Sequence, residues 1–278
     1  MNPSFDLAAL DRRARELRAR IIENSWRSGT PHLGSCLSCV DILVALYFHI
    51  LRHDPAEPTA PGRDRFILSK GHAVPALFQV LAEAGFFPPA LLADYGRIGS
   101  PFGEHPPAPG KIPGIEAATG SLGHGLPMGV GMALAARLSR QDSRVFVLLG
   151  DGECNEGSVW EAALLAAGQA LGSLTVVVDY NKWQGTGRSN EIMALAPLVE
   201  KWRAFGWDAE EIDGHDLGAV CTALARTAPA EGAPPRAIIA HTVKGKGVSF
   251  MEDDNNWHYR IPTEAEVAAA KRELGVAA

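Results

Sequence analysis

The second half of the chain alternates short strand-like runs with helix-like segments, and this pattern restricts the fold more than any other feature. Predicted strands lie at 145–149, 174–179, 207–212 and 236–242, after an earlier one at 65–69. Most of these runs are almost continuously apolar, as expected for parallel strands covered on both faces. We therefore predict an α/β fold: a parallel sheet with helices on both faces.

Helical patterns and one long loop fill the rest of the chain. Leucine and isoleucine recur at helical spacing through most of the first ~50 residues, with a glycine-rich break before a second helix at about 38–51. Further helices are predicted from Gly71 through Leu81 and at about 126–138, 158–170, 195–205 and 216–227. The stretch 99–125 is rich in glycine and proline and is predicted to be a functional loop. Residues 1–278 are expected to form a single domain with helical N-terminal decoration.

Composition excludes several classes of protein. The net charge of −6 leaves no basic excess for nucleic acid. The longest apolar stretch, around 42–51, is shorter than the ~20 residues of a membrane span. Charges throughout the N-terminus do not resemble a signal peptide. Cys36 and Cys39 form a CxxC without a second pair, which favours helix packing over a zinc site. We expect a cytoplasmic protein without nucleic-acid or membrane partners.

Polar residues follow two of the predicted strands. Gly150-Asp151-Gly152 follows the first, and Asn181 follows the second, 30 residues after Asp151, which is one strand–helix–strand unit. Side chains at the carboxyl ends of two such strands can reach one ion. A carboxylate, an amide and a backbone carbonyl form the hard-oxygen set that magnesium prefers. An aspartate here repels a bare diphosphate but attracts Mg²⁺, which then bridges to the phosphates.

Two other types of phosphate-binding site fit the sequence less well. The spacing of Gly150, Gly152 and Gly157 superficially resembles a nicotinamide dinucleotide turn, but Asp151 and Glu153 stand beside it. The segment 244–249, KGKGVS, lacks the spacing of a P-loop.

Several blocks together resemble, in order, the N-terminal region of transketolases. They are PHLGSCLSCVDILVALY, ILSKGHAVPALF, GEHPPAPGKIPGIEAATGSLGHGLPMGVGMALA, GDGECNEGSVWEAA, DYNKWQGTG, EIDGHD and TVKGKGVSFMEDDNNWH. Transketolases of the usual kind are more than twice as long, with a pyrimidine-binding and a C-terminal domain after this one. The chain therefore resembles the N-terminal, diphosphate-binding subunit of a split transketolase, with the thiamine diphosphate-binding fold.

This resemblance implies thiamine diphosphate and a divalent cation as cofactors. Mg²⁺, or another cation such as Ca²⁺ or Mn²⁺, would be bound by Asp151, Asn181 and the backbone carbonyl of Trp183. The residues implied to contact thiamine diphosphate are His72, Ser121, Leu122, Gly123, Gly152, Glu153, Asn181 and Lys244. The family has glutamine where this chain has His124, so no polar role is assigned to that side chain.

Four histidines match family positions around the sugar. His32, His72, His105 and His258 are implied to be catalytic, and imidazole can both donate and accept a proton near neutral pH. The implied reaction transfers a two-carbon ketol unit from a ketose, or its phosphate, to an aldose, or its phosphate. Tyr259, with Arg260 after it, follows His258 where many relatives have a small residue, so the substrate entrance can differ.

The resemblance also implies a partner. The family glutamate that acts on the aminopyrimidine belongs to a domain that no segment here resembles, so a separate C-terminal subunit with the pyrimidine-binding and C-terminal domains is expected, in a heterotetramer. Glu156 matches a carboxylate that couples to the neighbouring subunit. Two alternatives remain: a component of another thiamine-dependent carboligase or 2-oxo acid dehydrogenase, which the PHLGS and KGHA blocks disfavour, and a non-catalytic binding protein, which the retained site residues disfavour.

Overall fold

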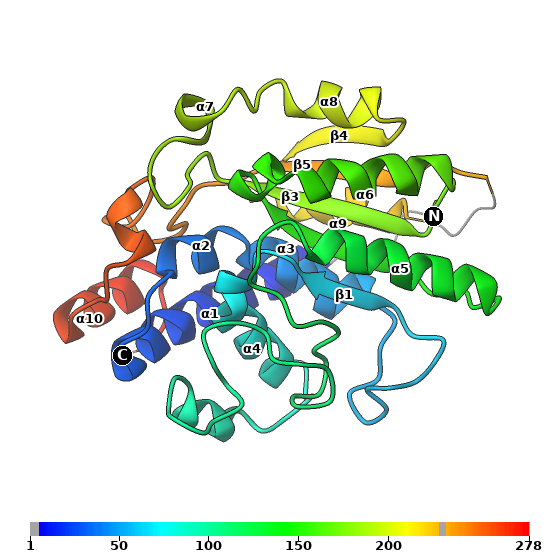
Figure 1. Ribbon diagram of the computed structural model, residues 1–278. Helices are drawn as coiled ribbons and strands as arrows, with labels where there is room; N and C mark the ends of the chain where they lie inside the picture. The colour runs from blue at the N-terminus through cyan, green and yellow to red at the C-terminus, as the bar shows by residue number, and fades with distance from the viewer. Residues whose placement is uncertain (1–5, 228–231, 278) are drawn as a thin grey trace.

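A parallel sheet forms the centre of the computed structural model, which describes residues 6–227 and 232–277. Within those residues the sheet has five strands in the order β1-β2-β3-β5-β4 (Figure 1). They are β1 (Arg65–Leu68), β2 (Val145–Gly150), β3 (Leu174–Tyr180), β4 (Asp208–Asp213) and β5 (Arg236–His241). All neighbouring pairs are parallel, so the predicted parallel sheet and its strands are confirmed.

Helices cover both faces of this sheet, as predicted. The helices of the described residues are α1 (Leu7–Ser28), α2 (Leu33–Ser38), α3 (Val40–Ala45), α4 (Val74–Glu83), α5 (Gly125–Leu138), α6 (Gly157–Gly168), α7 (Ser189–Ile192), α8 (Leu198–Ala204), α9 (Leu217–Ala225) and α10 (Glu264–Glu273). Shorter helical turns are η1 (Leu46–Ile50), η2 (Gly71–Ala73), η3 (Pro89–Asp94), η4 (Gly152–Asn155) and η5 (Asn255–His258).

The apolar strands supply two separate cores because successive side chains point to opposite faces. Phe146 and Leu148 of β2 pack in the core formed with α1, α3, α4 and α9. Val145, Val147 and Leu149 pack in the other core, with α5, α6 and α8. The two layers lie on opposite sides of the sheet (Figure 1). The N-terminal helices, expected as decoration, thus supply most of the cover on one face, and a single domain over 1–278 stays a prediction.

Two helical segments differ from the prediction. The helix predicted at about 38–51 is found as α3 and η1, and a separate short helix, α2, precedes it, because Gly34 of the predicted glycine-rich break lies inside α2. A Cβ on Gly34 would come within 2.8 Å of Cγ of Lys244, so this glycine permits close packing. Helix α8 begins at Leu198 instead of 195, directly after Pro197, as proline's missing N–H favours a helix start.

Helix α10 was not predicted. A capping box between Thr263 and Glu266 begins it, and of its residues only Val267 and Ala270 are buried. With so few buried positions the sequence shows little apolar periodicity.

The sheet register brings the two polar strand ends together. Strands β2 and β3 are neighbours, and Gly150 lies opposite Asp179. Asp151 and Asn181 therefore follow adjacent strands at the same edge, as predicted. Residues 99–124 contain neither helix nor strand, which confirms the predicted long loop.

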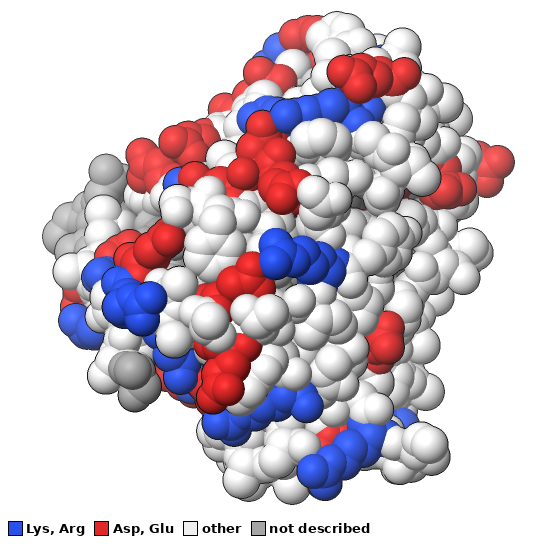
Figure 2. Space-filling view, turned by 90° about the vertical axis from the view of Figure 1, so that its left-hand side faces the viewer, with Lys and Arg blue, Asp and Glu red and all other residues white. Residues whose placement is uncertain are grey.

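The surface carries mixed charge where it can be seen from the side of α10 and α7. Figure 2 shows lysine and arginine lying among aspartate and glutamate there, with uncharged residues over much of the right-hand half of the view. No helix in 6–227 or 232–277 combines the length and the apolar character needed to cross a membrane. All four cysteines are buried and unbonded.

Candidate functional site

Asp151 is a buried carboxylate directly after β2. It is 2% exposed and accepts hydrogen bonds from the backbone N–H of Gly152 (2.9 Å), the backbone N–H of Lys182 (2.8 Å) and the hydroxyl of Ser189 (2.8 Å). Among the described residues it forms no ion pair. Burial is the main cause that raises the pKa of Asp151 from 3.8 to about 6. A buried carboxylate that forms no ion pair is a favourable place for a metal ion.

Asn181 lies beside this carboxylate at the end of β3. Lys182, which follows it, has a positive φ of 72°, and this turn directs its N–H to Asp151. The amide oxygen of Asn181 accepts from the backbone N–H of Trp183 (3.1 Å). The predicted metal ligands thus come from one compact turn and the neighbouring strand end. No group of three or more His, Cys, Asp or Glu in the described part of the chain could hold a metal by itself, so a cation here needs further oxygen ligands.

Glu153 joins three segments around the glycine turn. Its buried carboxylate accepts from the backbone N–H of Gly123 (2.9 Å), the backbone N–H of Gly150 (3.1 Å) and the hydroxyl of Ser69. Burial raises the pKa of Glu153. The side chain therefore ties the long loop to the ends of β1 and β2, so that only the backbone of Glu153 is left for a contact with a diphosphate.

Glycines allow the long loop to approach the sheet edge closely. A Cβ on Gly71 would lie 2.7 Å from the backbone nitrogen of Gly120. Gly123 has a φ of +83°, and its carbonyl accepts from the hydroxyl of Ser158 (2.9 Å). Ser121 and Leu122, predicted to contact the cofactor, stand in this fixed segment between Gly120 and Gly123.

The four predicted histidines form one cluster. The ring centroid of His32 lies 5.5 Å from that of His72, 5.2 Å from that of His258 and 6.5 Å from that of His105. The backbone N–H of His32 also donates to the carbonyl of His258 (2.9 Å). These residues stand before α2, in η2, in the long loop and in η5, so four separate segments meet here.

Burial keeps three of these imidazoles neutral near pH 7. It is the main cause that lowers the pKa of His32 to about 4 and that of His258 to about 3, and it lowers the pKa of His72 well below its ordinary value. Nearby lysines and histidines act in the same direction. A neutral imidazole donates from one ring nitrogen and accepts at the other, as the handling of hydroxyl protons requires.

Lys244 stands between the histidine cluster and the strand ends. Its ammonium donates to the side-chain oxygen of Asn255 (2.7 Å) and lies 3.1 Å from Nδ1 of His258. Burial, together with the charge of Lys70, lowers the pKa of Lys244 to about 8. The side chain is thus a buried cation at neutral pH.

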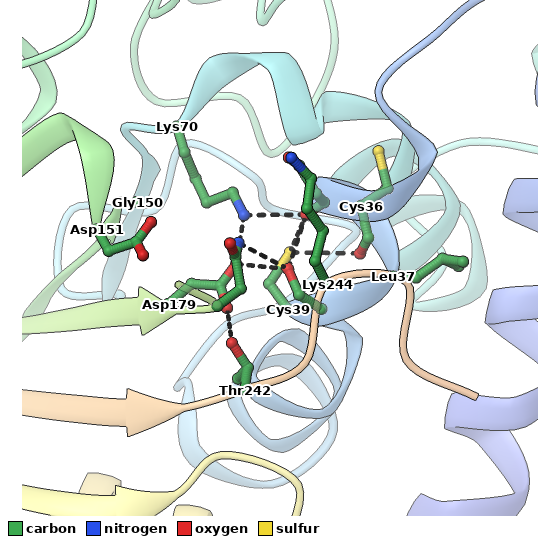
Figure 3. A network of polar contacts seen from close by, with 12 residues as sticks. Cys36, Leu37, Cys39, Lys70, Gly150, Asp151, Asp179, Thr242 and Lys244 are labelled. Atoms are coloured by element: carbon green, nitrogen blue, oxygen red, sulfur yellow. Dashed lines mark hydrogen bonds and ion pairs between the residues drawn. The ribbon is translucent and has the colours of Figure 1, made fainter. Parts of the chain in front are cut away.

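Two buried charged residues of this region were missed by the sequence analysis. Lys70 and Asp179 form an ion pair beside Asp151 (Figure 3). Both lie in segments that the sequence analysis singled out for another residue, His72 in one and Asn181 in the other. A lysine beside the GH of KGHA and an aspartate closing an apolar strand were the available signals.

Comparison with known proteins gives the family. Residues 11–278 match the family described as "Transketolase, thiamine diphosphate binding domain". The chain belongs to this family.

The transketolase relatives fall into two groups by length. The chain is 40% identical over 270 residues to one of the subunits of the apulose-4-phosphate transketolase of Phocaeicola vulgatus, covering 97% of this chain and 95% of the relative. It is 41% identical over 265 residues to the 6-deoxy-6-sulfo-D-fructose transketolase subunit SqwG of Clostridium sp. (strain MSTE9), covering 95% and 96%. Human transketolase is 39% identical over 253 residues, but this chain covers only 40% of its length.

Solved transketolases share the fold. The structure of transketolase from Campylobacter jejuni superimposes with a TM-score of 0.90 at 28% identity, over 98% of this chain and 43% of the other. The chain thus spans about two fifths of that enzyme. The predicted fold and the predicted resemblance to a split transketolase subunit are confirmed.

Proposed function

We propose that the chain is the thiamine diphosphate-binding subunit of a two-component transketolase, a transferase that moves a two-carbon ketol unit from a ketose or ketose phosphate to an aldose or aldose phosphate. One observation carries the proposal: a buried carboxylate that forms no ion pair among the described residues, Asp151, lies at a sheet edge bordered by four clustered histidines. Family membership makes thiamine diphosphate the cofactor that fits this edge.

The chemistry of the donors supports a metal-bridged diphosphate. Mg²⁺, or a similar divalent cation, would be held by Asp151, Asn181 and the carbonyl of Trp183, with diphosphate oxygens completing its coordination. Lys244 and the backbone of the glycine turn at Gly152 would contact the phosphates. Glu153, Ser121, Leu122 and Gly123 would contribute through the backbone of the loop and turn, and His72 through its ring. When bound, the cofactor supplies the chemistry that cleaves and forms the bond next to the sugar carbonyl.

The histidines would handle the protons of the sugar. Because the pKa values of His32, His72 and His258 are lowered, each ring is neutral near pH 7 and can donate a hydrogen bond to a sugar oxygen from one nitrogen while accepting one at the other. His105 extends the cluster at its exposed edge. The buried ammonium of Lys244 beside His258 opposes protonation of that ring.

A separate partner subunit is proposed for two reasons. The two relatives of similar length are named as subunits of transketolases. Apolar side chains are also exposed on neighbouring helices, Met128 on α5 and Leu164 and Leu165 on α6, and Glu156 is exposed beside them. We propose that a C-terminal subunit with the pyrimidine-binding and C-terminal domains completes a heterotetramer.

The cellular location and the sugar substrates are proposed only in general terms. Four unbonded cysteines support a reducing, cytoplasmic environment. The relatives are named after two different sugars, apulose-4-phosphate and 6-deoxy-6-sulfo-D-fructose, so the donor and acceptor are proposed only as sugars or sugar phosphates.

A calorimetric titration tests the cofactor site. Thiamine diphosphate is titrated into the chain with Mg²⁺ or with EDTA, alone and mixed with the partner subunit, and Asp151→Asn is the matched variant. We expect heat that requires Mg²⁺, is absent in Asp151→Asn and reflects tighter binding with the partner. Equal heat in EDTA, or no heat even with the partner, would contradict the proposal.

A further inference from the structure

A fully buried ion pair adjoins the candidate site and is not explained by cofactor contact. Lys70 is 1% exposed and Asp179 is 0% exposed, and the lysine ammonium contacts Oδ2 of Asp179 (Figure 3). Removing two charges from water is costly and is tolerated only when hydrogen bonds satisfy both groups. Such a pair beside a functional site therefore needs a specific explanation.

Hydrogen bonds satisfy the pair from several directions. Oδ2 of Asp179 accepts from the hydroxyl of Ser38 (2.6 Å), and Oδ1 accepts from the hydroxyl of Thr242. The ammonium of Lys70 also donates to the carbonyl of Ser35 (2.9 Å). The pair thus joins α2, the start of η2, the end of β3 and the segment after β5 (Figure 3).

Each of these four segments carries one residue of the candidate site. His32 immediately precedes α2, His72 lies in η2, Asn181 follows β3 and Lys244 follows β5. A change in the pair would therefore reach residues that lie far apart in the sequence.

The contact with Asn181 is the most specific of these connections. The amide nitrogen of Asn181 lies 3.4 Å from Oδ2 of Asp179 and 3.5 Å from the hydroxyl oxygen of Ser38. Only the nitrogen end of an amide can donate to a carboxylate. Asp179 therefore fixes which way the amide faces, and the carbonyl end of Asn181 is held away from the pair, toward Trp183.

We propose that Lys70 and Asp179 are a positioning pair, in which Asp179 orients the amide of Asn181 so that its oxygen faces the divalent cation, and Lys70 balances the charge of Asp179. This inference rests on the proposed function, because it gives Asn181 a cation to face. The pair acts through Asn181 and touches neither substrate nor cofactor. Lys70 is needed because Asp179 alone would be a second buried anion near Asp151.

Two neutral double variants separate positioning from mere burial. Lys70→Met/Asp179→Asn keeps a carbonyl acceptor for the amide of Asn181, whereas Lys70→Met/Asp179→Leu removes it at similar volume. Both remove the ion pair. In Mg²⁺, calorimetry should show that the leucine variant binds thiamine diphosphate about 10- to 100-fold more weakly than the asparagine variant, the range typical for lost support of a metal ligand. The leucine variant should unfold at a lower temperature, because the hydroxyls of Ser38 and Thr242 lose an acceptor, so affinities are compared well below both unfolding midpoints.

The route through Asn181 is tested by a mutant cycle. In an Asn181→Ala background the difference in affinity between the two double variants should disappear, because the oriented group is gone. If the difference persists undiminished there, or if the two double variants bind equally in the original background, the positioning role is overturned.

A milder substitution covers the case in which the double variants do not fold. Ser38→Ala removes the second contact of the Asn181 amide and one donor to Asp179, and it should weaken Mg²⁺-dependent binding several-fold with little change in the unfolding midpoint. Unchanged affinity in Ser38→Ala would overturn the inference. If the unmodified chain binds the cofactor and these variants do not weaken that binding, the proposed function is left intact. If the unmodified chain does not bind the cofactor even with the partner subunit, both the inference and the proposed function are overturned.

Discussion

Asp151→Asn is expected to stabilise the chain in the absence of divalent cations. Burial is the main cause that raises the pKa of Asp151 from 3.8 to about 6, and the charge of Asp179 adds to it. An acid with a raised pKa in the folded state contributes stability that is fully present below about pH 4 and is lost as the pH rises through about 6. At pH 7.5 ionised Asp151 therefore destabilises the folded chain by about 3 kcal/mol, at about 1.4 kcal/mol per pH unit.

The hydrogen bonds of Asp151 reduce the expected gain. The carboxylate accepts from Gly152, Lys182 and Ser189, and an asparagine would turn its NH₂ group toward at least one of these donors. One lost buried hydrogen bond costs about 1–2 kcal/mol. The net expectation is that Asp151→Asn stabilises the metal-free chain by about 1–2 kcal/mol at pH 7.5.

Urea unfolding in EDTA at pH 7.5 and pH 4.5 measures this. At pH 4.5 the original chain should recover about 2 kcal/mol relative to the variant, because its carboxyl group is then mostly protonated, and the advantage of the variant should vanish. With Mg²⁺ and thiamine diphosphate present, only the original chain should gain stability. A variant less stable than the original at pH 7.5 in EDTA, or a difference that does not change with pH, would refute the reasoning.

Three further predictions concern the groups around the site. Affinity for thiamine diphosphate should fall as the pH rises through about 8, where Lys244 loses its charge, and calorimetry from pH 6.5 to 9 should show no such fall in Lys244→Met. Gly120→Ala places a Cβ 2.7 Å from Cδ2 of His105, so kcat/KM for a ketose should fall roughly tenfold or more; unchanged kinetics would contradict this. Tyr259 is 66% exposed, and its ring centroid lies 4.6 Å from that of His258. Tyr259→Gly should therefore change the KM values for a panel of ketoses, and Tyr259→Phe should change them much less. KM values that are the same in Tyr259→Gly and in the original chain would exclude a role of Tyr259 in specificity.

The strands and the meeting of Asp151 with Asn181 could be predicted because both depend on local pattern and simple topology. Each strand that is covered on both faces can be recognised from its own apolar run. Two consecutive parallel strands then place their carboxyl ends at the same edge of the sheet. The histidine cluster was expected from family resemblance alone. His32 and His258 stand at opposite ends of the sequence, and no spacing rule connects them.

The pairing of Lys70 with Asp179 could not be predicted in the same way. It depends on how α2, η2 and the ends of β3 and β5 are packed, and the two residues are separated by 109 positions. A lysine and an aspartate in a sequence usually indicate exposed side chains. Only the assembled fold shows that both are enclosed and that their hydrogen bonds reach Asn181.

Turnover with and without the partner subunit tests the central proposal most directly. The purified chain, the partner and their mixture are assayed for two-carbon transfer from a ketose phosphate to an aldose phosphate, with Mg²⁺ and thiamine diphosphate present. The mixture should turn over, each component alone should not, and the mixture made with Asp151→Asn should be inactive. Full turnover by the chain alone, or an inactive mixture that nevertheless binds the cofactor, would contradict the assignment of this chain as one half of a two-component transketolase.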